Sequence, residues 1–544
     1  ALLPARAQVT PSPPSPPSPS SPPATAAAPD GGYVDKVIEG LAPEEQAEAQ
    51  AYPYDQTGWP RFLKLETRLG TEPFDDRRSA RLGYSVYGVL ETPNHGTLSI
   101  DALYAPDDSD GTLTLRQTNM PLGGGWLANH SLGYVDTPSP SITRLPSRVF
   151  VPTSILEGVS GEWEHPGKGF QFQAATGEPG RLEILPSTGF RRLPGRRSVL
   201  GAQWRLGADA AADPLGLSRK GWTLAAQHEN ARGVSNFETP VLPQDVVDAN
   251  ASMLALRHEG ERHRLKAHAV SSNNSALDGG RSGYWIDGEW DDGPRRHGAG
   301  AYRLEPDLSW ANLPMANNIF GAYLRSGWRT RQWSAEGSID WLDSIVGTRG
   351  SGFFATGSAR WRLNRDNAFG VGSTVRRFNG NAWSTYADWR FQNGWGASGL
   401  RLELTGDDSQ ADSQGITWDQ EWGVPQGWAL STSLGATAYD ATEFQTAETA
   451  LRGAVSMAMP LSGKANLRGI FNTERSNAGQ TRHNLNLGAE WRIDTRWSLE
   501  GNYNRSTGRS RLNRSIDPLA PVPPVIAESD RSFYAVLRYE FEAG

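Results

Sequence analysis

The stretch that decides the fold is "TRHNLNLGAEWRIDTRWSLEGNYNRSTG", residues 481–508, in which two polar–apolar alternations flank a short polar break. A period of two places alternate residues on opposite faces of a β-strand, and a break of three polar residues indicates a hairpin turn. The break is Asp494-Thr495-Arg496. The apolar or small face consists of Leu485, Leu487, Ala489, Trp491 and Ile493 before the break, and of Trp497, Leu499, Gly501 and Tyr503 after it.

The same alternation continues through most of the chain. From about residue 60 to residue 541, strand-like segments follow one another without a long helical segment between them. At roughly 20 residues per strand and loop, this region has space for about 22–26 strands of the ~10-residue kind that cross a membrane. Clear examples are residues 62–69, 333–341, 353–363 and 383–391.

Composition excludes several classes of protein. The 544 residues include no Cys, and this excludes a disulfide framework, thiolate metal sites and a Cys nucleophile. The net charge is −7 and no basic face is clustered, so nucleic-acid binding is not expected. Only 37% of the residues are hydrophobic, and no apolar run approaches the ~20 residues of a membrane-spanning helix.

The apolar face of these strands needs a covering. A soluble β-protein covers such a face with a second sheet or with helices, but helical segments are nearly absent here and the other face is densely charged. A membrane barrel reverses the arrangement, because its apolar residues face lipid and its charges face a wet lumen. We therefore predict an all-β fold, a large closed antiparallel transmembrane β-barrel. The residues predicted to face lipid include Phe353, Trp361, Leu487, Trp491, Leu499 and Leu537.

The chain before the barrel divides into three segments. Residues 1–7 match the end of a secretory signal peptide, with Ala5-Arg6-Ala7 as a small-x-small cleavage pattern; the alternative is an ordinary disordered start. Residues 8–30 are rich in Pro and Ser and predict an extended linker. Residues 31–59 predict a short helical segment, periplasmic or plug-like, whose most common fate is packing against the body of the protein. Residues 60–544 form the predicted barrel.

The last strand carries a resemblance to a known class. "RSFYAVLRYEF", residues 531–541, alternates Phe533, Ala535, Leu537, Tyr539 and Phe541. It resembles the final strand of bacterial outer-membrane β-barrel proteins, which carries their assembly signal, although residues 542–544 follow the aromatic residue. The resemblance implies the Gram-negative outer membrane as location, a periplasmic N-terminal extension, and membrane lipid, lipopolysaccharide and the barrel-assembly machinery as partners.

Among outer-membrane barrels, the expected strand number is similar to that of the large secretion pores. Two subfamilies fit, the fimbrial ushers and the exopolysaccharide-export porins. The resemblance implies first an usher-like channel for secretion or assembly of a surface structure, with secreted protein subunits as partners. One alternative is an export or diffusion porin for polysaccharide, sugars or ions, and another is a non-conducting scaffold or adhesin.

One segment departs from the alternation and is the candidate pore element. Residues 139–200 are rich in Pro, which central strands tolerate poorly, so part of this segment is predicted to be loop or edge. It forms either a long extracellular loop or a basic constriction folded into the lumen, which would favour anions. Its candidate constriction residues are Arg144, Arg148, Arg181, Arg191, Arg192, Arg196 and Arg197.

Catalytic, cofactor and metal sites are not predicted. The sequence has no G-x-S-x-G motif, so we do not expect an enzyme. His263 and His268 are five residues apart, on opposite faces of a strand, which does not suit a shared metal. The carboxylate clusters at 286–293 and 406–413 lack the spacing of an EF-hand and predict solvated loops rather than Ca²⁺ sites.

Overall fold

The computed structural model describes residues 61–71, 80–106, 110–144, 147–182, 189–208, 220–235, 246–347, 350–378, 380–408, 410–424, 427–441, 446–477, 479, 481–508 and 529–543. The N-terminal segments predicted at residues 1–7, 8–30 and 31–59 lie outside these ranges.

Almost every described element is a β-strand. The first half of the wall consists of β1 (Arg61–Gly70), β2 (Arg81–Thr92), β3 (Gly96–Ala105), β4 (Asp110–Gly123), β5 (Trp126–Asp136), β6 (Ile155–His165), β7 (Phe170–Leu182), β9 (Arg196–Arg205), β10 (Gly221–Ser235), β11 (Val246–Glu259), β12 (His263–Asn274), β13 (Arg281–Asp292) and β14 (Arg295–Leu304).

The second half consists of β17 (Ile319–Arg329), β18 (Trp333–Ser344), β19 (Gly352–Arg362), β20 (Asn367–Arg377), β21 (Asn381–Asn393), β22 (Gly396–Asp407), β23 (Gln410–Trp422), β24 (Ala429–Tyr439), β25 (Glu448–Ser462), β26 (Ala465–Ser476), β27 (Thr481–Arg492), β28 (Trp497–Thr507) and β29 (Ser529–Ala543). Four short elements complete the described fold: the 3₁₀ turn Pro166–Lys168, β8 (Phe190–Arg192), β15 (Ser309–Trp310) and β16 (Leu313–Pro314).

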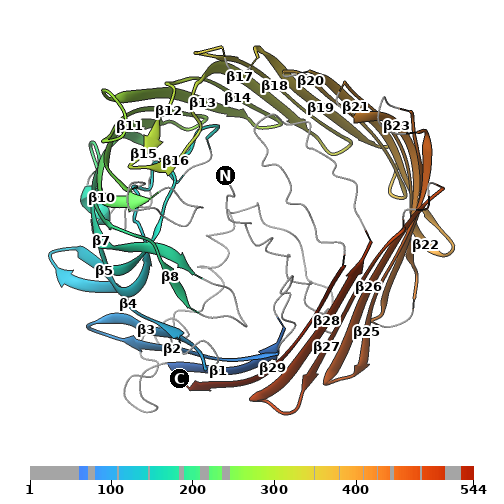
Figure 1. Ribbon diagram of the computed structural model, residues 1–544, viewed down its shortest axis with the longest axis horizontal. Coiled ribbons are helices and arrows are strands. Elements are labelled where there is room, and N and C mark those ends of the chain that lie inside the picture. The colour runs from blue at the N-terminus through green and yellow to red at the C-terminus, as the bar shows by residue number, and fades with distance from the viewer. Residues whose placement is uncertain are drawn as a thin grey trace, which may run out of the picture.

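The wall strands form one closed ring. Each wall strand pairs antiparallel with the next wall strand along the chain, and β29 returns to pair with β1 (Figure 1). The result is a closed antiparallel barrel of 26 strands, so the predicted fold class and strand number are confirmed. β8 pairs with the end of β7, while β15 and β16 form a separate small hairpin inside the ring (Figure 1). Among the described residues, no helix is long and apolar enough to cross a membrane.

The stretch at 481–508 forms the hairpin that its pattern predicts. β27 pairs with β28 so that Leu487 lies opposite Tyr503 and Trp491 lies opposite Leu499. In the turn, the Asp494 carboxylate accepts hydrogen bonds from the backbone N–H groups of Arg496 (2.7 Å) and Trp497 (2.8 Å). These two donors stabilise the ionised carboxylate and lower the pKa of Asp494. A turn of this kind explains why the alternation restarts at residue 497.

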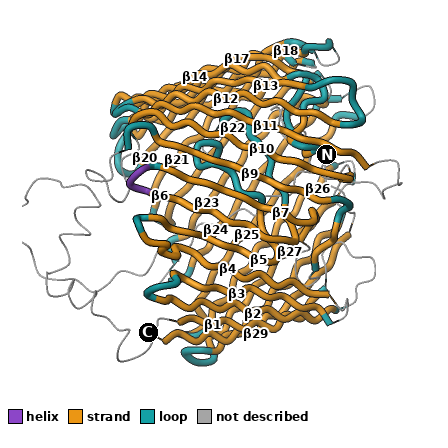
Figure 2. The backbone as a smooth tube through the Cα atoms, turned by 90° about the vertical axis from the view of Figure 1, so that its left-hand side faces the viewer, coloured by secondary structure: helices purple, strands orange, loops and turns teal. Residues whose placement is uncertain are grey.

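The two rims of the barrel differ, and the tilted strands run between them (Figure 2). The rim that holds the start of β1 and the end of β29 has mostly short turns, such as residues 93–95 and 330–332. The opposite rim sends out longer connections, including residues 137–154 and 305–318. Outer-membrane barrels place short turns in the periplasm and longer loops outside the cell.

The outer face of the barrel is apolar with aromatic residues near both rims. Trp361, Leu487, Trp491, Leu499 and Leu537 are exposed on it, and the side chain of Phe353 is half-buried on the same face. Near the short-turn rim the rings of Trp333 and Trp361 stack at 5.0 Å. Trp341, eight residues from Trp333 on β18, is exposed near the other rim. A tilted strand advances roughly 20 Å over that distance, close to the height of a lipid-facing band.

The direction in which each side chain of β27 points predicts how much an introduced charge destabilises the barrel. Leu487 is exposed on the outer face, whereas Asn486 points into the lumen and its amide donates to Asn504. Leu487→Arg should destabilise the folded barrel by roughly 2–4 kcal/mol near the midplane, because it places a guanidinium in hydrocarbon. Asn486→Arg should cost much less, because water reaches the lumen.

The measurement is urea unfolding in lipid vesicles, followed by the mobility difference between unheated and boiled samples on a denaturing gel. Equal destabilisation by the two substitutions would contradict the assignment of faces.

Candidate functional site

The lumen carries a charge network at the seam where the barrel closes. The buried carboxylate of Glu66 on β1 accepts hydrogen bonds from Arg68 (2.6 Å) and from Arg538 on β29 (2.7 Å). Arg538 also lies 3.7 Å from Glu500 on β28, and Glu500 pairs with Arg468 on β26 at 3.2 Å. Alternating charges therefore link the first strand to the last ones across the inner face. Charge-assisted hydrogen bonds of this kind are the stronger ones in proteins.

Beside this network lies a wall of asparagine amides. A hollow of about 440 Å³ on β26–β28 is lined by Asn472, Asn484, Asn486, Asn502 and Asn504 together with Arg468 and Ile470. Four of the amides come from the stretch at 481–508, where they occupy the face opposite to the apolar one. Each amide both donates and accepts hydrogen bonds. This part of the lumen can therefore bind polar, uncharged groups such as hydroxyls.

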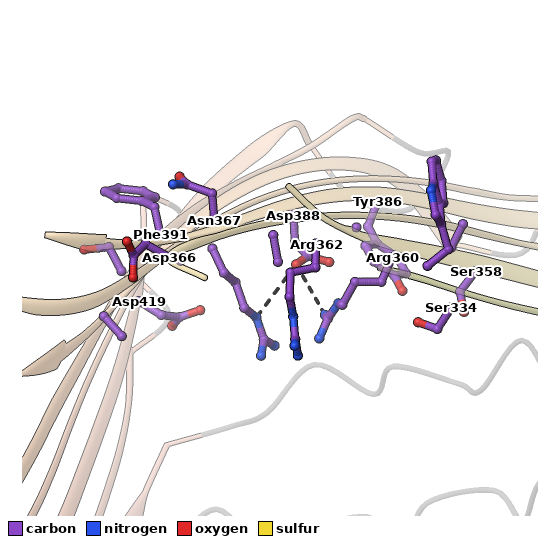
Figure 3. Close-up of a pocket in the computed structure, with 18 of the residues that line it drawn as sticks. Ser334, Ser358, Arg360, Arg362, Asp366, Asn367, Tyr386, Asp388, Phe391 and Asp419 are labelled. Carbon is purple, nitrogen blue, oxygen red and sulfur yellow. Dashed lines mark hydrogen bonds and ion pairs between the residues drawn. The ribbon is translucent and has the colours of Figure 1, made fainter. Parts of the chain in front are cut away.

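A large hollow lies toward the short-turn rim, with a volume of about 1780 Å³. Asp388 sits between two arginines on its wall, 3.4 Å from Arg360 and 3.8 Å from Arg390 (Figure 3). Arg362 lies beside Arg360 on β19, and Asp419 adds a carboxylate from β23. The wall here carries both signs of charge, with apolar side chains such as Val455 and Ile470 between the polar ones.

Two connections from the long-loop rim fold back inside the barrel. Residues 137–144, 147–154 and 305–318, here called the inner platform, pack on the inner face of β9–β14 and β17–β18. Inward residues of the wall, including Met253, Trp285 and Tyr302, are buried there, although inward residues of a water-filled lumen are usually wet. The platform contributes the buried apolar side chains Ile142, Val149, Leu308, Trp310, Leu313 and Met315.

A buried ion pair fixes the second connection to the wall. Arg197 on β9 and Glu229 on β10 pair at 2.7 Å, with only 2% and 0% of their side chains exposed. The indole N–H of Trp310 donates to the second oxygen of Glu229 at 2.6 Å, and Arg197 also donates to the carbonyl of Ala311 at 3.0 Å. The pair thus binds the tip of the β15–β16 hairpin. Loss of either partner would leave a buried, unpaired charge and destabilise the fold. The positions of β9, β10 and the β15–β16 hairpin therefore depend on one another.

The first connection is held by polar contacts as well. The Ser147 hydroxyl donates to Asp287 on β13 at 2.6 Å, and Arg148 pairs with Asp340 on β18 at 3.1 Å. Gln203 on β9 accepts from the backbone N–H of Ile142 at 3.0 Å. These contacts reach three strands of the wall, β9, β13 and β18, and keep the connection along the inner surface.

The candidate constriction residues do not form one ring. Arg148 and Arg197 form the ion pairs that fix the inner platform to the wall. Arg144, in the first segment of the platform, pairs with Glu162 on β6 at 3.4 Å. Arg192 donates to Glu157 at 2.8 Å at an exposed position. The remaining positions lie on strands at the long-loop rim: Arg181 opposite Arg191 where β7 meets β8, and Arg196 at the start of β9.

The segment at 139–200 is neither one extracellular loop nor one constriction. Its first part folds into the lumen, whereas residues 155–165, 170–182 and 196–205 are wall strands β6, β7 and β9. Pro179 occurs within β7, opposite Leu156, so a proline did not mark a loop at that position. The sequence pattern did not identify Glu229 or Trp310. A buried inward carboxylate such as Glu229 occupies the same position in the polar–apolar pattern as a carboxylate that faces water.

The remaining candidate positions are also placed. The predicted solvated loop at 286–293 is wrong up to Asp292, because these residues belong to β13 and Asp287 is buried. The cluster at 406–413 lies around the tight β22–β23 hairpin. His268 faces inward and stacks on Trp285 at 4.7 Å, whereas His263 contacts His258 on the outer face. Within the described residues, no three His, Asp or Glu side chains are grouped as for a metal ion.

Comparison with known proteins finds no matching family model and no matching curated protein. Large barrels among solved structures are similar at low identity. A mutant of the ferric enterobactin receptor PfeA from Pseudomonas aeruginosa is 10% identical, with 90% of this chain and 81% of that chain covered and a TM-score of 0.39.

Two further barrels are similar to the same extent. The P pilus usher (PapC) translocation pore is 10% identical, with 89% and 99% covered and a TM-score of 0.34. The copper transporter OprC is 8% identical, with 89% and 80% covered and a TM-score of 0.36. Similarity at this level concerns the β-barrel fold alone.

The hydrogen bond from Trp310 to the Arg197–Glu229 ion pair predicts the local stability of the inner platform. Trp310→Ala should leave a cavity and an unfilled hydrogen-bond site, which together cost about 3–5 kcal/mol of local stability. Hydrogen exchange of the backbone amides at 308–315 should therefore accelerate strongly. The matched control is Trp333→Ala on the outer face, which should leave that exchange unchanged. Slow exchange in the Trp310→Ala protein would show that the platform is held by other contacts.

Proposed function

We propose that this chain is an outer-membrane passage for a macromolecule, of the usher-like kind that secretes or assembles a surface structure. The observation that carries the proposal is a closed wall of 26 strands that is apolar and aromatic outside and lined with ions and amides inside. Such a wall separates a water-filled interior from lipid. Ions and amides along a water-filled interior support transport as the role.

The width of the ring favours a large cargo. A circular barrel of 26 strands, at usual strand spacing and tilt, measures about 50 Å between opposite backbones. Porins of 16–18 strands already leave an aqueous channel for small solutes. A wider ring is not needed for ions or simple sugars, so its size supports protein subunits or a hydrated polymer as cargo.

The inner platform shapes this interior unevenly. It packs on the wall from β9 to β18, whereas the amide-lined hollow and the charge network at the seam lie on β26–β29 and β1. A cargo that enters the described interior therefore meets hydrated groups on one side and a firmly packed shelf on the other. The platform narrows the passage at the long-loop rim.

A second candidate is an export porin for polysaccharide, and the asparagine wall favours it. Sugar hydroxyls need partners that both donate and accept hydrogen bonds, as amides do. Five such amides line one hollow on β26–β28. Membrane lipid, lipopolysaccharide, the barrel-assembly machinery and a periplasmic N-terminal extension belong to both proposals.

Conductance tests the passage directly. The full chain in a planar bilayer should conduct ions without any partner protein. Replacement of residues 306–317 by a short Gly-Ser turn should increase the unit conductance, because it removes half of the inner platform and leaves the wall strands intact. Cells that produce this variant should also become more sensitive to large antibiotics.

The contrary outcomes are clear for each part of the proposal. A parent chain that never conducts would support a scaffold or adhesin instead. An unchanged conductance in the shortened variant would remove the platform from the passage. Brief current blocks by neutral oligosaccharides, shortened by Asn486→Ala with Asn504→Ala, would favour the polysaccharide porin over the usher-like channel.

A further inference from the structure

The lipid-facing surface has a hollow where small residues meet larger ones. A space of about 610 Å³ opens on the outer face between β10 and β14. Its floor on β12 consists of Ala267 and Ala269, and Ala301 continues it on β14. Because methyl groups replace the bulky side chains found around them, the outer surface is indented rather than smooth.

The hollow is a groove that runs along β12. Ala269 lies opposite Leu254 on β11 and Tyr284 on β13, and both of these side chains are more than half exposed. Ala267 lies in the same way between Leu256 and Ile286. The two walls stand two strand spacings apart, about 10 Å, which leaves space for one hydrocarbon chain between the side chains. Nearly all of the lining is apolar.

The outer face becomes polar immediately beyond the groove, toward the long-loop rim. The next outward position on four neighbouring strands is a hydroxyl or an imidazole: His228, Ser252, Ser271 and Ser282 lie opposite one another in sequence from β10 to β13. His228 and Ser252 are in hydrogen-bond contact at 2.9 Å. This row supplies several donors at the level where lipid headgroups begin.

A guanidinium stands at the same end of the groove. Arg303 on β14 lies opposite Tyr284, forms part of the lining and is exposed on the outer face. Among the described residues, no side-chain hydrogen bond or ion pair engages its guanidinium. Arg192, another exposed arginine near this rim, is by contrast paired with Glu157. A free, permanently ionised group at the membrane surface attracts an anion, and its planar fork suits phosphate.

We propose that this groove binds one acyl chain of a lipid whose phosphorylated headgroup is held by Arg303 and the hydroxyl row. In the leaflet at the long-loop rim of an outer-membrane barrel, that lipid is lipopolysaccharide. The acyl chain fills the groove along β12, and the phosphate rests where the surface changes from apolar to polar. The site goes beyond the proposed function, because it does not depend on what crosses the lumen.

The chain contains a matched control for this site. A second hollow of about 780 Å³ on the outer face is also apolar, with Ala174 on its floor and Leu132 and Leu200 among its walls. The arginine in its lining, Arg116, lies on the inner face, 3.9 Å from Asp101. Ala174→Leu therefore fills an apolar hollow of the same kind that lacks a free outward guanidinium.

The test measures binding of lipid A, with and without its phosphates, to the detergent-purified full chain by native mass spectrometry. The parent should prefer phosphorylated lipid A by about tenfold, the usual effect of one charge-assisted hydrogen-bonded contact. Arg303→Gln should abolish this preference, and Arg303→Lys should retain part of it. Ala269→Leu should weaken binding of both lipids, whereas Ala174→Leu should not.

Gel mobility of unheated samples shows that each variant is folded. An unchanged phosphate preference in Arg303→Gln would overturn the headgroup assignment. Equal effects of Ala269→Leu and Ala174→Leu would show that lipid A coats the barrel without a specific groove. Because only outward residues change, the conductance of each variant should equal that of the parent, and this separates failure here from failure of the proposed passage.

Discussion

The pairing of the first strand with the last is the constraint on which the rest of the structure depends. Hydrocarbon offers no hydrogen-bond partners, so an open sheet edge is not tolerated within a membrane. β1 and β29 meet over ten residue pairs, from Arg61 opposite Ala543 to Gly70 opposite Tyr534. Once this seam is closed, each strand has two neighbours, and the faces follow from the period of two. Inside the lumen, Glu66 reinforces the seam through Arg68 and Arg538.

Closure also creates two very different interiors. Along β19–β29 and β1, charges and amides alternate in a hydrated wall, where each ion pair adds little stability but keeps the surface wet. Along β9–β14, two connections fold back and bury the wall, and the Arg197–Glu229 pair becomes almost fully enclosed. A buried pair is weak support for stability, because both ions lose their hydration. The role of the pair here is to fix the position of the β15–β16 hairpin. Trp310 and Ala311 reach their hydrogen-bond partners, Glu229 and Arg197, in only one placement of the hairpin.

The sequence predicts those parts of the structure in which polar and apolar residues alternate with a period of two. Alternation predicts the all-β barrel, the strand number and the outward face of residues such as Leu487 and Trp491, because a regular strand obeys one simple rule. The restart at Trp497 locates a turn that the Asp494 side chain stabilises. The fate of residues 137–154 and 305–318 is not predicted, because irregular segments have no period and long-range contacts direct them. The carboxylates at 286–293 suggested a loop, although Asp287 is an inward strand residue that Ser147 covers.

The most direct test of the account is a disulfide across the closing seam, which the absence of native Cys makes simple to interpret. Thr67 and Leu537 lie opposite each other on β1 and β29, so their Cα atoms are about 4.5–5.5 Å apart, within disulfide reach. In membranes, oxidised T67C/L537C should give a circularised chain with altered gel mobility that reductant reverses. T67C/F533C, four residues out of register, should not. Absence of the first cross-link, or equal yields of the two, would contradict a barrel closed in this register.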